Sequence, residues 1–204
     1  MGCRHLRRIL ALALLAGVLL VGCQRQPAAP PVTPQQPPPT PEPARPEGDM
    51  DFTLESTNFH EGSEIPAYHT GDGEDASPQL SWSDPPEGTE ELALICDDPD
   101  APGGTWVHWV IYGLSPELRS LPEAVPTHQT VVDLDMAKQG RNSWGEIGYR
   151  GPKPPSGTHH YSFRLYALDA PTDLDPGATK EELLAAMEGH ILAEAELVGL
   201  YSAH

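Results

Sequence analysis

Residues 96–109 read CDDPDAPGGTWVHW, and this stretch contains the strongest indications of the fold. It begins at the end of an apolar run, residues 92–96 (LALIC), which is typical of a buried β-strand. Prolines and glycines then turn the chain, and residues 106–112 (WVHWVIY) resume with β-type side chains. The pattern predicts two neighbouring strands joined by a rigid acidic loop.

The same stretch brings carboxylates and an imidazole near one another. Asp98 and Asp100 are two residues apart, so in an extended segment they point the same way. His108 shares a strand face with Trp106 on the returning strand. One interpretation is a site that uses Asp and His together. The other is an acidic turn beside a surface histidine, since Asp and Pro are common turn residues.

A second segment, residues 148–161, reads GYRGPKPPSGTHHY and leads from a Gly/Pro loop into a strand. His159 and Tyr161 lie on one face of that strand, and His160 lies on the other. Glycines permit close approach of a ligand to the backbone, and their amides can face an anion. A rigid loop carrying surface histidines remains the alternative.

Short β-type runs separated by turns continue through the rest of the chain. One helix is expected late, with Thr179 as its N-cap and Glu182 as the capping-box partner. These features predict a mainly β, antiparallel β-sandwich-like domain with a few short peripheral helices. The expected strands are residues 52–54, 79–82, 91–96, 106–112, 130–134, 160–168 and 193–200. The apolar residues at helical spacing are Leu183, Leu184, Met187, Ile191 and Leu192, with Gly189 a candidate break.

The first 23 residues have the pattern of a secretory signal, with arginines followed by the apolar run 9–21. Residues 20–23 (LVGC) resemble a bacterial lipobox, in which the cysteine becomes the lipidated first residue. We therefore expect residues 1–23 to be a lipoprotein signal peptide and Cys23 to anchor the exported protein in the cell envelope. A plain signal peptide and an uncleaved anchor are the alternatives, and the choice between inner and outer membrane stays open.

Residues 24–49 are predicted to be a disordered linker, and residues 50–204 one globular domain. Ten of the twenty residues 27–46 are proline, which favours extended geometry and leaves little apolar surface to bury. Such a segment would act as a tether. The remaining residues suffice for one domain with its own core.

Charge and cysteine content exclude some classes of function. Removal of the signal leaves nine basic and thirty acidic residues, so the net charge is 9 − 30 = −21. Nucleic acid is therefore not an expected partner, because its binding relies on Lys and Arg. Outside the signal and lipid site only Cys96 remains, so no disulfide framework is expected. A buried inert thiol is the favoured interpretation of Cys96, and a nucleophile is the alternative.

The two motifs DDPDAPGGTWVHW and GEIGYRGPKPPSGTHHYSFRLYALD resemble the phosphatidylethanolamine-binding protein family, in its bacterial Raf-kinase-inhibitor-like branch. Residues 65–82 resemble its N-terminal block and residues 183–201 its C-terminal helix and strand. The resemblance implies two antiparallel sheets and a small pocket for phosphate-like anions or phospholipid head groups. The implied ligand-binding residues are Asp98, Asp100, His108, His159 and Tyr161, with Gly151 and Pro152 at the rim.

Three positions depart from the family pattern. Gly71 stands where the family often has cysteine, Lys153 replaces a small residue or cysteine, and His160 stands where arginine is usual. The loop before His159 is also shorter than in many relatives. These differences affect the expected width and preference of the pocket.

The resulting expectation is a module that binds a small anionic or phosphorylated ligand, with no cofactor, metal or catalytic residue. Asp side chains would hold one or both histidines, and the imidazolium rings would donate to the anion. The membrane would be contacted only through the lipid, and any protein partner is unidentified. Alternatives are a protease or kinase inhibitor acting through the rim, a zinc or iron site of two His and an Asp, and a small hydrolase. For a hydrolase, Ser143 and Ser156 lack the surrounding nucleophile motif.

Overall fold

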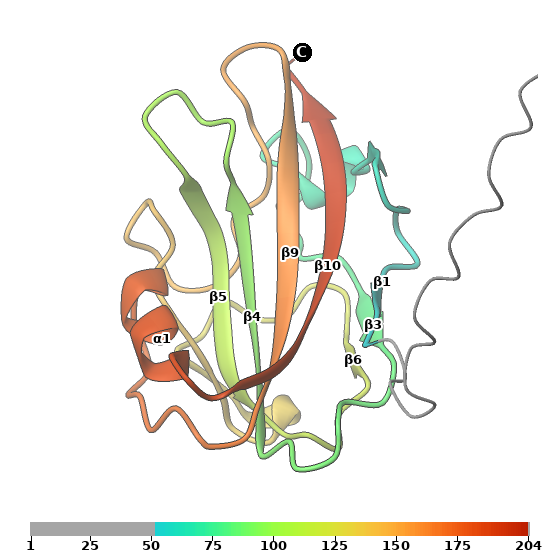
Figure 1. The fold of residues 1–204 in the computed structure, drawn as a ribbon. Helices are drawn as coiled ribbons and strands as arrows, with labels where there is room; N and C mark the ends of the chain where they lie inside the picture. Colours follow the sequence, from blue (N-terminus) through green and yellow to red (C-terminus); the bar gives the residue numbers. More distant parts are fainter. Residues whose placement is uncertain (1–51, 204) are drawn as a thin grey trace, which may run out of the picture. The chain divides into compact units, whose positions relative to one another are not determined.

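The computed structural model describes residues 52–203, which form a seven-stranded sheet, a three-stranded sheet and one α-helix (Figure 1). In spatial order the larger sheet contains β2 (Ser63–Glu64), β10 (Ile191–Ser202), β9 (Thr158–Leu168), β4 (Glu91–Asp98), β5 (Trp106–Leu114), β8 (Ala137–Gln139) and β7 (Thr130–Val131). The smaller sheet contains β1 (Leu54–Glu55), β3 (Leu80–Trp82) and β6 (Ser120–Leu121). Two short 3-10 helices are η1 (Ala67–His69) and η2 (Val132–Leu134), and the α-helix is α1 (Lys180–Met187).

The central strand β4 is buried on both faces, which explains its continuous apolar run. Leu92, Leu94 and Cys96 belong to the core between the two sheets. Ala93 and Ile95 point the other way and belong to a second apolar cluster. A strand covered on both sides has no wet face and therefore shows no polar alternation.

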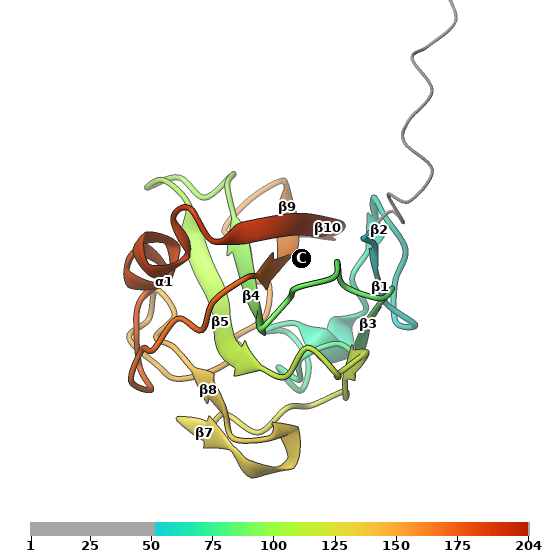
Figure 2. The same cartoon turned by 60° about the horizontal axis from the view of Figure 1, so that its bottom comes forward.

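Two layers cover the larger sheet, one on each face (Figure 2). The three-stranded sheet contributes Leu80, Trp82 and Leu121 to the core on one face. Helix α1 covers the opposite face with Leu183 and Met187, both fully buried. At roughly 1.5–3 kcal/mol for each large apolar side chain, this burial is the main stabilising contribution to the fold.

The capping box predicted for the helix is present. The backbone N–H of Glu182 donates to the Thr179 hydroxyl at 3.3 Å, and the N–H of Thr179 donates to the Glu182 carboxylate at 2.8 Å. The two bonds satisfy backbone donors that have no partner within the first helical turn. They fix where α1 begins, beside the sheet face that it covers.

The prediction of a mainly β, sandwich-like fold is confirmed, and every strand pairing but one is antiparallel. The exception is β2, which pairs in parallel with the end of β10. Strands β4, β5 and β9 cover the residues expected for them and extend a little further. They run side by side in the middle of the sheet (Figure 1).

Two local predictions need correction. The helical spacing continues to Ile191 and Leu192, with Gly189 as a candidate break; α1 ends at Met187, before that glycine, and both residues begin β10. Gly189, which has a φ of +82°, lies between the two elements and changes the direction of the chain. Residues 130–134 form only a two-residue strand, after which the chain enters η2.

The predicted signal peptide (residues 1–23), the predicted linker (residues 24–49) and Cys23 lie outside the described residues. Within residues 52–203, no helix has both the length and the apolar character needed to cross a bilayer.

Candidate functional site

Three neighbouring strands bring most of the predicted site residues to one end of the larger sheet. Asp98 is the last residue of β4, His108 lies near the start of β5, and His159 and Tyr161 lie at the start of β9. The loop between β4 and β5 and the loop that leads into β9 are at the top in Figure 1. Antiparallel pairing of β4 with both neighbours places these positions together, although they are up to 63 residues apart in the sequence.

His108 occupies a β-bulge that the sequence did not reveal. Cys96 pairs with Trp109 and Asp97 pairs with Val107, so β5 has one extra residue at this point. A bulge bends its strand and redirects a side chain, and bulges are frequent beside functional sites. In this chain the bulge is located at the histidine of the WVHW motif.

The loop before β9 holds His108 in place through two reciprocal hydrogen bonds. The His108 ring donates from Nδ1 to the carbonyl oxygen of Arg150 at 2.5 Å, and the Arg150 N–H donates to the His108 carbonyl at 3.0 Å. The next residue, Gly151, donates its N–H to Asp75 at 2.5 Å. Tyr149 donates its hydroxyl to the carbonyl of His69 at 2.8 Å. The loop is therefore fixed on both sides of Arg150.

Asp98 holds the second histidine. Its Oδ2 lies 2.7 Å from Nδ1 of His159, and both side chains are almost fully buried. Its other oxygen accepts the N–H of Asp100 at 2.8 Å, which shapes the turn after β4. Carboxylates were expected to orient one or both histidines; a carboxylate orients His159, and a backbone carbonyl orients His108.

Asp100 does not point the same way as Asp98. Its carboxylate accepts the N–H of His160 at 2.9 Å and lies 2.6 Å from the Nδ1 of the same residue. Both Asp100 and His160 are exposed. The alternation expected for an extended segment fails because β4 ends at Asp98 and the chain turns at once.

The Asp98–His159 pair, His108 and Tyr161 line a cavity of about 240 Å³. Its walls are mainly apolar, with two tryptophans and several prolines around the polar atoms. The full lining is Asp98, Ala101, Pro102, Gly103, Trp106, His108, Trp144, Lys153, Pro154, Pro155, His159 and Tyr161.

Three of the predicted site residues lie beside this cavity and do not line it. Asp100 is on the outer surface, as described above. Gly151 lines an adjoining cavity of about 260 Å³, which shares Trp144 and Lys153 with the first. Pro152 is buried, and its carbonyl accepts the N–H of Gly71 at 2.9 Å.

Trp144 is a lining residue that the sequence reasoning missed. Its ring makes edge contacts with Trp106 at 5.3 Å and His108 at 5.1 Å between centroids, and the Arg150 guanidinium lies over it at 4.6 Å. Buried Asn142 shapes its loop by accepting the N–H groups of Trp144 and Glu146. An aromatic residue within an Asn/Ser/Gly segment was the available signal.

Three polar atoms of the cavity are open to it. In residues 52–203, every side-chain nitrogen or oxygen that is completely buried has a hydrogen-bond partner. Nε2 of His108, Nε2 of His159 and the Tyr161 hydroxyl have no partner within that part of the chain, so these atoms are not completely buried. All three residues line the cavity, and a ligand there could bond to all three atoms.

Burial controls the charge state of two of these groups. Desolvation lowers the pKa of His108, even though the bond to Arg150 and the nearby Asp98 act in the opposite direction. Burial, reinforced by Asp98, raises the pKa of Tyr161. Near neutral pH the cavity thus presents a neutral His108 and a protonated Tyr161 hydroxyl.

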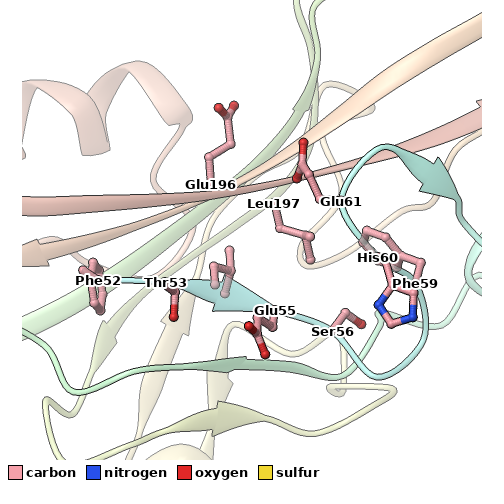
Figure 3. A pocket seen from close by; sticks show the side chains of 10 residues that line it. Phe52, Thr53, Glu55, Ser56, Phe59, His60, Glu61, Glu196 and Leu197 are labelled. Atoms are coloured by element: carbon pink, nitrogen blue, oxygen red, sulfur yellow. The ribbon is translucent and has the colours of Figure 1, made fainter. Parts of the chain in front are cut away.

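A larger cavity of about 530 Å³ lies elsewhere, between β1 and β10 (Figure 3). Two of its acidic residues already have partners, since Glu61 accepts the N–H of Val198 at 2.8 Å and Glu196 accepts from Arg164 at 3.1 Å. None of the predicted site residues lines it. The smaller cavity is therefore the better candidate, because unpartnered polar atoms converge there.

Other candidate groups from the sequence are placed as follows. Ser143 accepts the N–H of Val107 at 2.8 Å, and Arg141 donates to the carbonyl of Gly145 at 3.3 Å. Cys96 is a free thiol buried in the core between the sheets. Among the described residues, no three His, Cys, Asp or Glu side chains are arranged to hold a metal ion.

The chain is similar to several known proteins over the described domain. The model of the phosphatidylethanolamine-binding protein family matches residues 55–202. A UPF0098 protein of Methanothermobacter thermautotrophicus is 53% identical over 150 residues, covering 74% of this chain and 98% of the relative. A UPF0098 protein of Aquifex aeolicus is 45% identical over 149 residues, covering 72% and 85% respectively.

Two solved structures are also similar. A structure from Chlamydia trachomatis, described as a homologue of phosphatidylethanolamine-binding protein, has a TM-score of 0.69 and 42% identity, covering 75% of this chain and 98% of the other. The structure of Escherichia coli YbcL, described as a new member of the mammalian phosphatidylethanolamine-binding protein family, has a TM-score of 0.70 and 30% identity. The match covers 75% of this chain and 99% of the other.

Proposed function

Because the chain belongs to the phosphatidylethanolamine-binding protein family, we propose that its Asp98–His159 cavity binds the phosphate of a small ligand or phospholipid head group. One observation carries this proposal. Three polar atoms without protein partners, on His108, His159 and Tyr161, converge in a cavity with apolar walls. A few convergent polar groups in an apolar recess are typical of small-ligand sites.

The charges of the cavity suit one tetrahedral anion. A protonated His159 would donate from Nε2, and Asp98 would balance the imidazolium on its other side. Tyr161 would donate its hydroxyl. Lys153 adds a cation at the wall and already contacts Asp72 at 3.0 Å. The apolar mouth formed by Trp106 and Trp144 would contact the remainder of the ligand.

Consecutive histidines of β9 provide a matched test. Inorganic phosphate and phosphorylethanolamine are titrated by calorimetry into the protein and into His159→Gln and His160→Gln. Loss of one charge-assisted hydrogen bond costs about 1.5–3 kcal/mol, so His159→Gln should weaken binding by roughly tenfold or more. His160 lies outside the cavity, and its variant should bind as the original protein does. If neither inorganic phosphate nor phosphorylethanolamine binds, the proposal is refuted.

A second candidate function is the binding of a protein through the rim of the cavity, as in an inhibitor of a protease or kinase. The observation that favours it is the exposure of two tryptophans, Trp106 at 37% and Trp144 at 38%. Tryptophan is enriched among residues that dominate protein interfaces. Partner binding that survives His159→Gln but is lost in Trp144→Ala would support this function over anion binding.

The membrane location proposed from the sequence depends on lipidation of Cys23. Cells producing the full chain would be labelled with a clickable fatty acid and separated into membrane and soluble fractions. Cys23→Ser should lose both the label and the membrane association, whereas Cys3→Ser, which alters a residue of the removed signal, should keep both. Equal labelling of the two variants would contradict anchoring through Cys23.

A further inference from the structure

The hydrogen bond between His108 and Arg150 determines which ring nitrogen carries the hydrogen. A carbonyl oxygen can only accept, so Nδ1 of His108 must be the donor. In a neutral imidazole the other nitrogen is then an acceptor. Nε2 of His108 is accessible from the cavity, as shown above, and therefore offers a lone pair to whatever binds there.

The surroundings of His108 are acidic, but burial favours the neutral ring. Burial is the largest influence on its pKa and lowers it, while the bond to Arg150 and three aspartates raise it. The titratable and charged groups around the ring come from several elements. They are Asp97 and Asp98 of β4, His159 and Tyr161 of β9, and Asp75, Arg150 and Lys153 of the loops.

An acceptor in the cavity distinguishes between phosphate forms. A phosphate dianion has only lone pairs, and it would face the lone pair of Nε2 without a hydrogen between them. A phosphate that keeps one proton has a P–OH group that can donate to this atom. Sulfate resembles phosphate in shape, but it carries no proton near neutral pH.

We propose that the cavity selects a phosphate group carrying one proton, and that Nε2 of His108 accepts that hydrogen bond. This inference rests on the proposed function and narrows it to free phosphate or a phosphate monoester, because the phosphodiester of an intact phospholipid carries no proton near neutral pH. No covalent bond changes; the proton stays between a phosphate oxygen and Nε2. A phosphate monoester has a second pKa of about 6. Above that pH, binding must take up one proton from solvent.

Calorimetry with inorganic phosphate and sulfate tests the inference on the original protein. Titrations at pH 6 to 9, each in two buffers of different ionisation enthalpy, give both the Kd and the number of protons taken up. We expect phosphate at pH 8 to take up about one proton more than sulfate does, and its Kd relative to that of sulfate to rise about tenfold per pH unit above the pKa of phosphate. Sulfate at pH 8 should bind at least about tenfold more weakly than phosphate.

The outcomes separate this inference from the function on which it rests. Phosphate binding with no more proton uptake than sulfate binding, and with sulfate bound equally well, would overturn the inference and leave the anion site intact. Absence of binding by both anions would overturn the two together. Proton uptake together with preference for phosphate would support both.

A pair of variants assigns the effect to His108. The amide of His108→Gln can present either its oxygen or its nitrogen, so the preference for phosphate over sulfate at pH 8 should fall toward one. His190→Gln makes the same change at an exposed histidine that pairs with Asp169 at 2.8 Å and does not line the cavity. It should keep the original preference. If His108→Gln does not fold, the preference of the original protein for phosphate over sulfate at pH 8 still decides the question, because a proton taken up by His159 would accompany either anion.

Discussion

Asp98 and His159 form a buried hydrogen-bonded pair, with 2.7 Å between Oδ2 of the carboxylate and Nδ1 of the ring. Two residues further on, Asp100 makes the equivalent contact with His160, but on the exposed side of β9. The two pairs join the loop after β4 to the start of β9. Only the inner pair lines the cavity. Substitutions at Asp98 and Asp100 can therefore be compared to separate effects on ligand binding from effects on the loop that both pairs hold.

We predict that Asp98→Asn destabilises the domain by about 1–3 kcal/mol and weakens phosphate binding, because a buried ring loses its charged partner. Asp100→Asn should cost at most about 1 kcal/mol, since its pair is exposed, and should leave binding unchanged. Denaturant unfolding and phosphate titration of both variants provide the measurements. Equal losses of stability in the two would show that burial of the inner pair has no special effect.

Substitution at two glycines should separate a tightly packed position from an open one. A Cβ on Gly151 would lie 2.2 Å from the His69 carbonyl oxygen and 2.8 Å from Cα of Thr70. Gly151→Ala should therefore cost about 1–3 kcal/mol or more and displace the loop that holds His108. A Cβ on Gly103 would meet no atom within 4 Å, and its φ is not positive. The melting temperature of Gly103→Ala should equal that of the original protein. A similar decrease in melting temperature in Gly151→Ala and Gly103→Ala would contradict the packing described.

Cys96 should not react with thiol reagents in the folded protein. Burial, reinforced by the charges of Asp97 and Asp98, raises the pKa of this thiol well above its usual value. Alkylation with iodoacetamide at pH 8, followed by peptide mapping, shows whether Cys96 is modified. We expect modification of Cys96 only after unfolding in denaturant. Rapid modification of the native protein would restore the interpretation of Cys96 as a nucleophile.

The strands that carry the site could be predicted because their patterns depend on local features. The apolar run that ends at Cys96 indicates a strand buried on both faces, and alternation after His159 indicates the long strand β9. The capping box at Thr179 is also local, since its two hydrogen bonds join residues three positions apart. Ile191 and Leu192 kept the helical spacing, but the end of α1 depends on the chain reversal at Gly189.

The details of the candidate site could be predicted only in part, because they depend on contacts between distant segments. Residue types and strand faces placed His159 and Tyr161 on one side of β9. No residue pattern indicates that a backbone carbonyl would hold His108, since any residue supplies one. The bulge at His108 and the turn that directs Asp100 outward likewise arise where strands end and register changes.

The stability of the domain should depend on pH through His108. Burial lowers the pKa of this ring below its usual value of 6.5, so between the two values the unfolded chain binds a proton that the folded chain does not. The contribution of the neutral His108 ring to the free energy of unfolding is therefore fully present above about pH 6.5, and it is lost as the pH falls below that value. Thermal unfolding of the original protein, His108→Gln and His190→Gln between pH 5 and 8 should show a smaller acid-side decrease in His108→Gln alone. If the curves of the original protein and His108→Gln run parallel, the ring is not held neutral by burial, and the acceptor assigned to Nε2 would be lost with it.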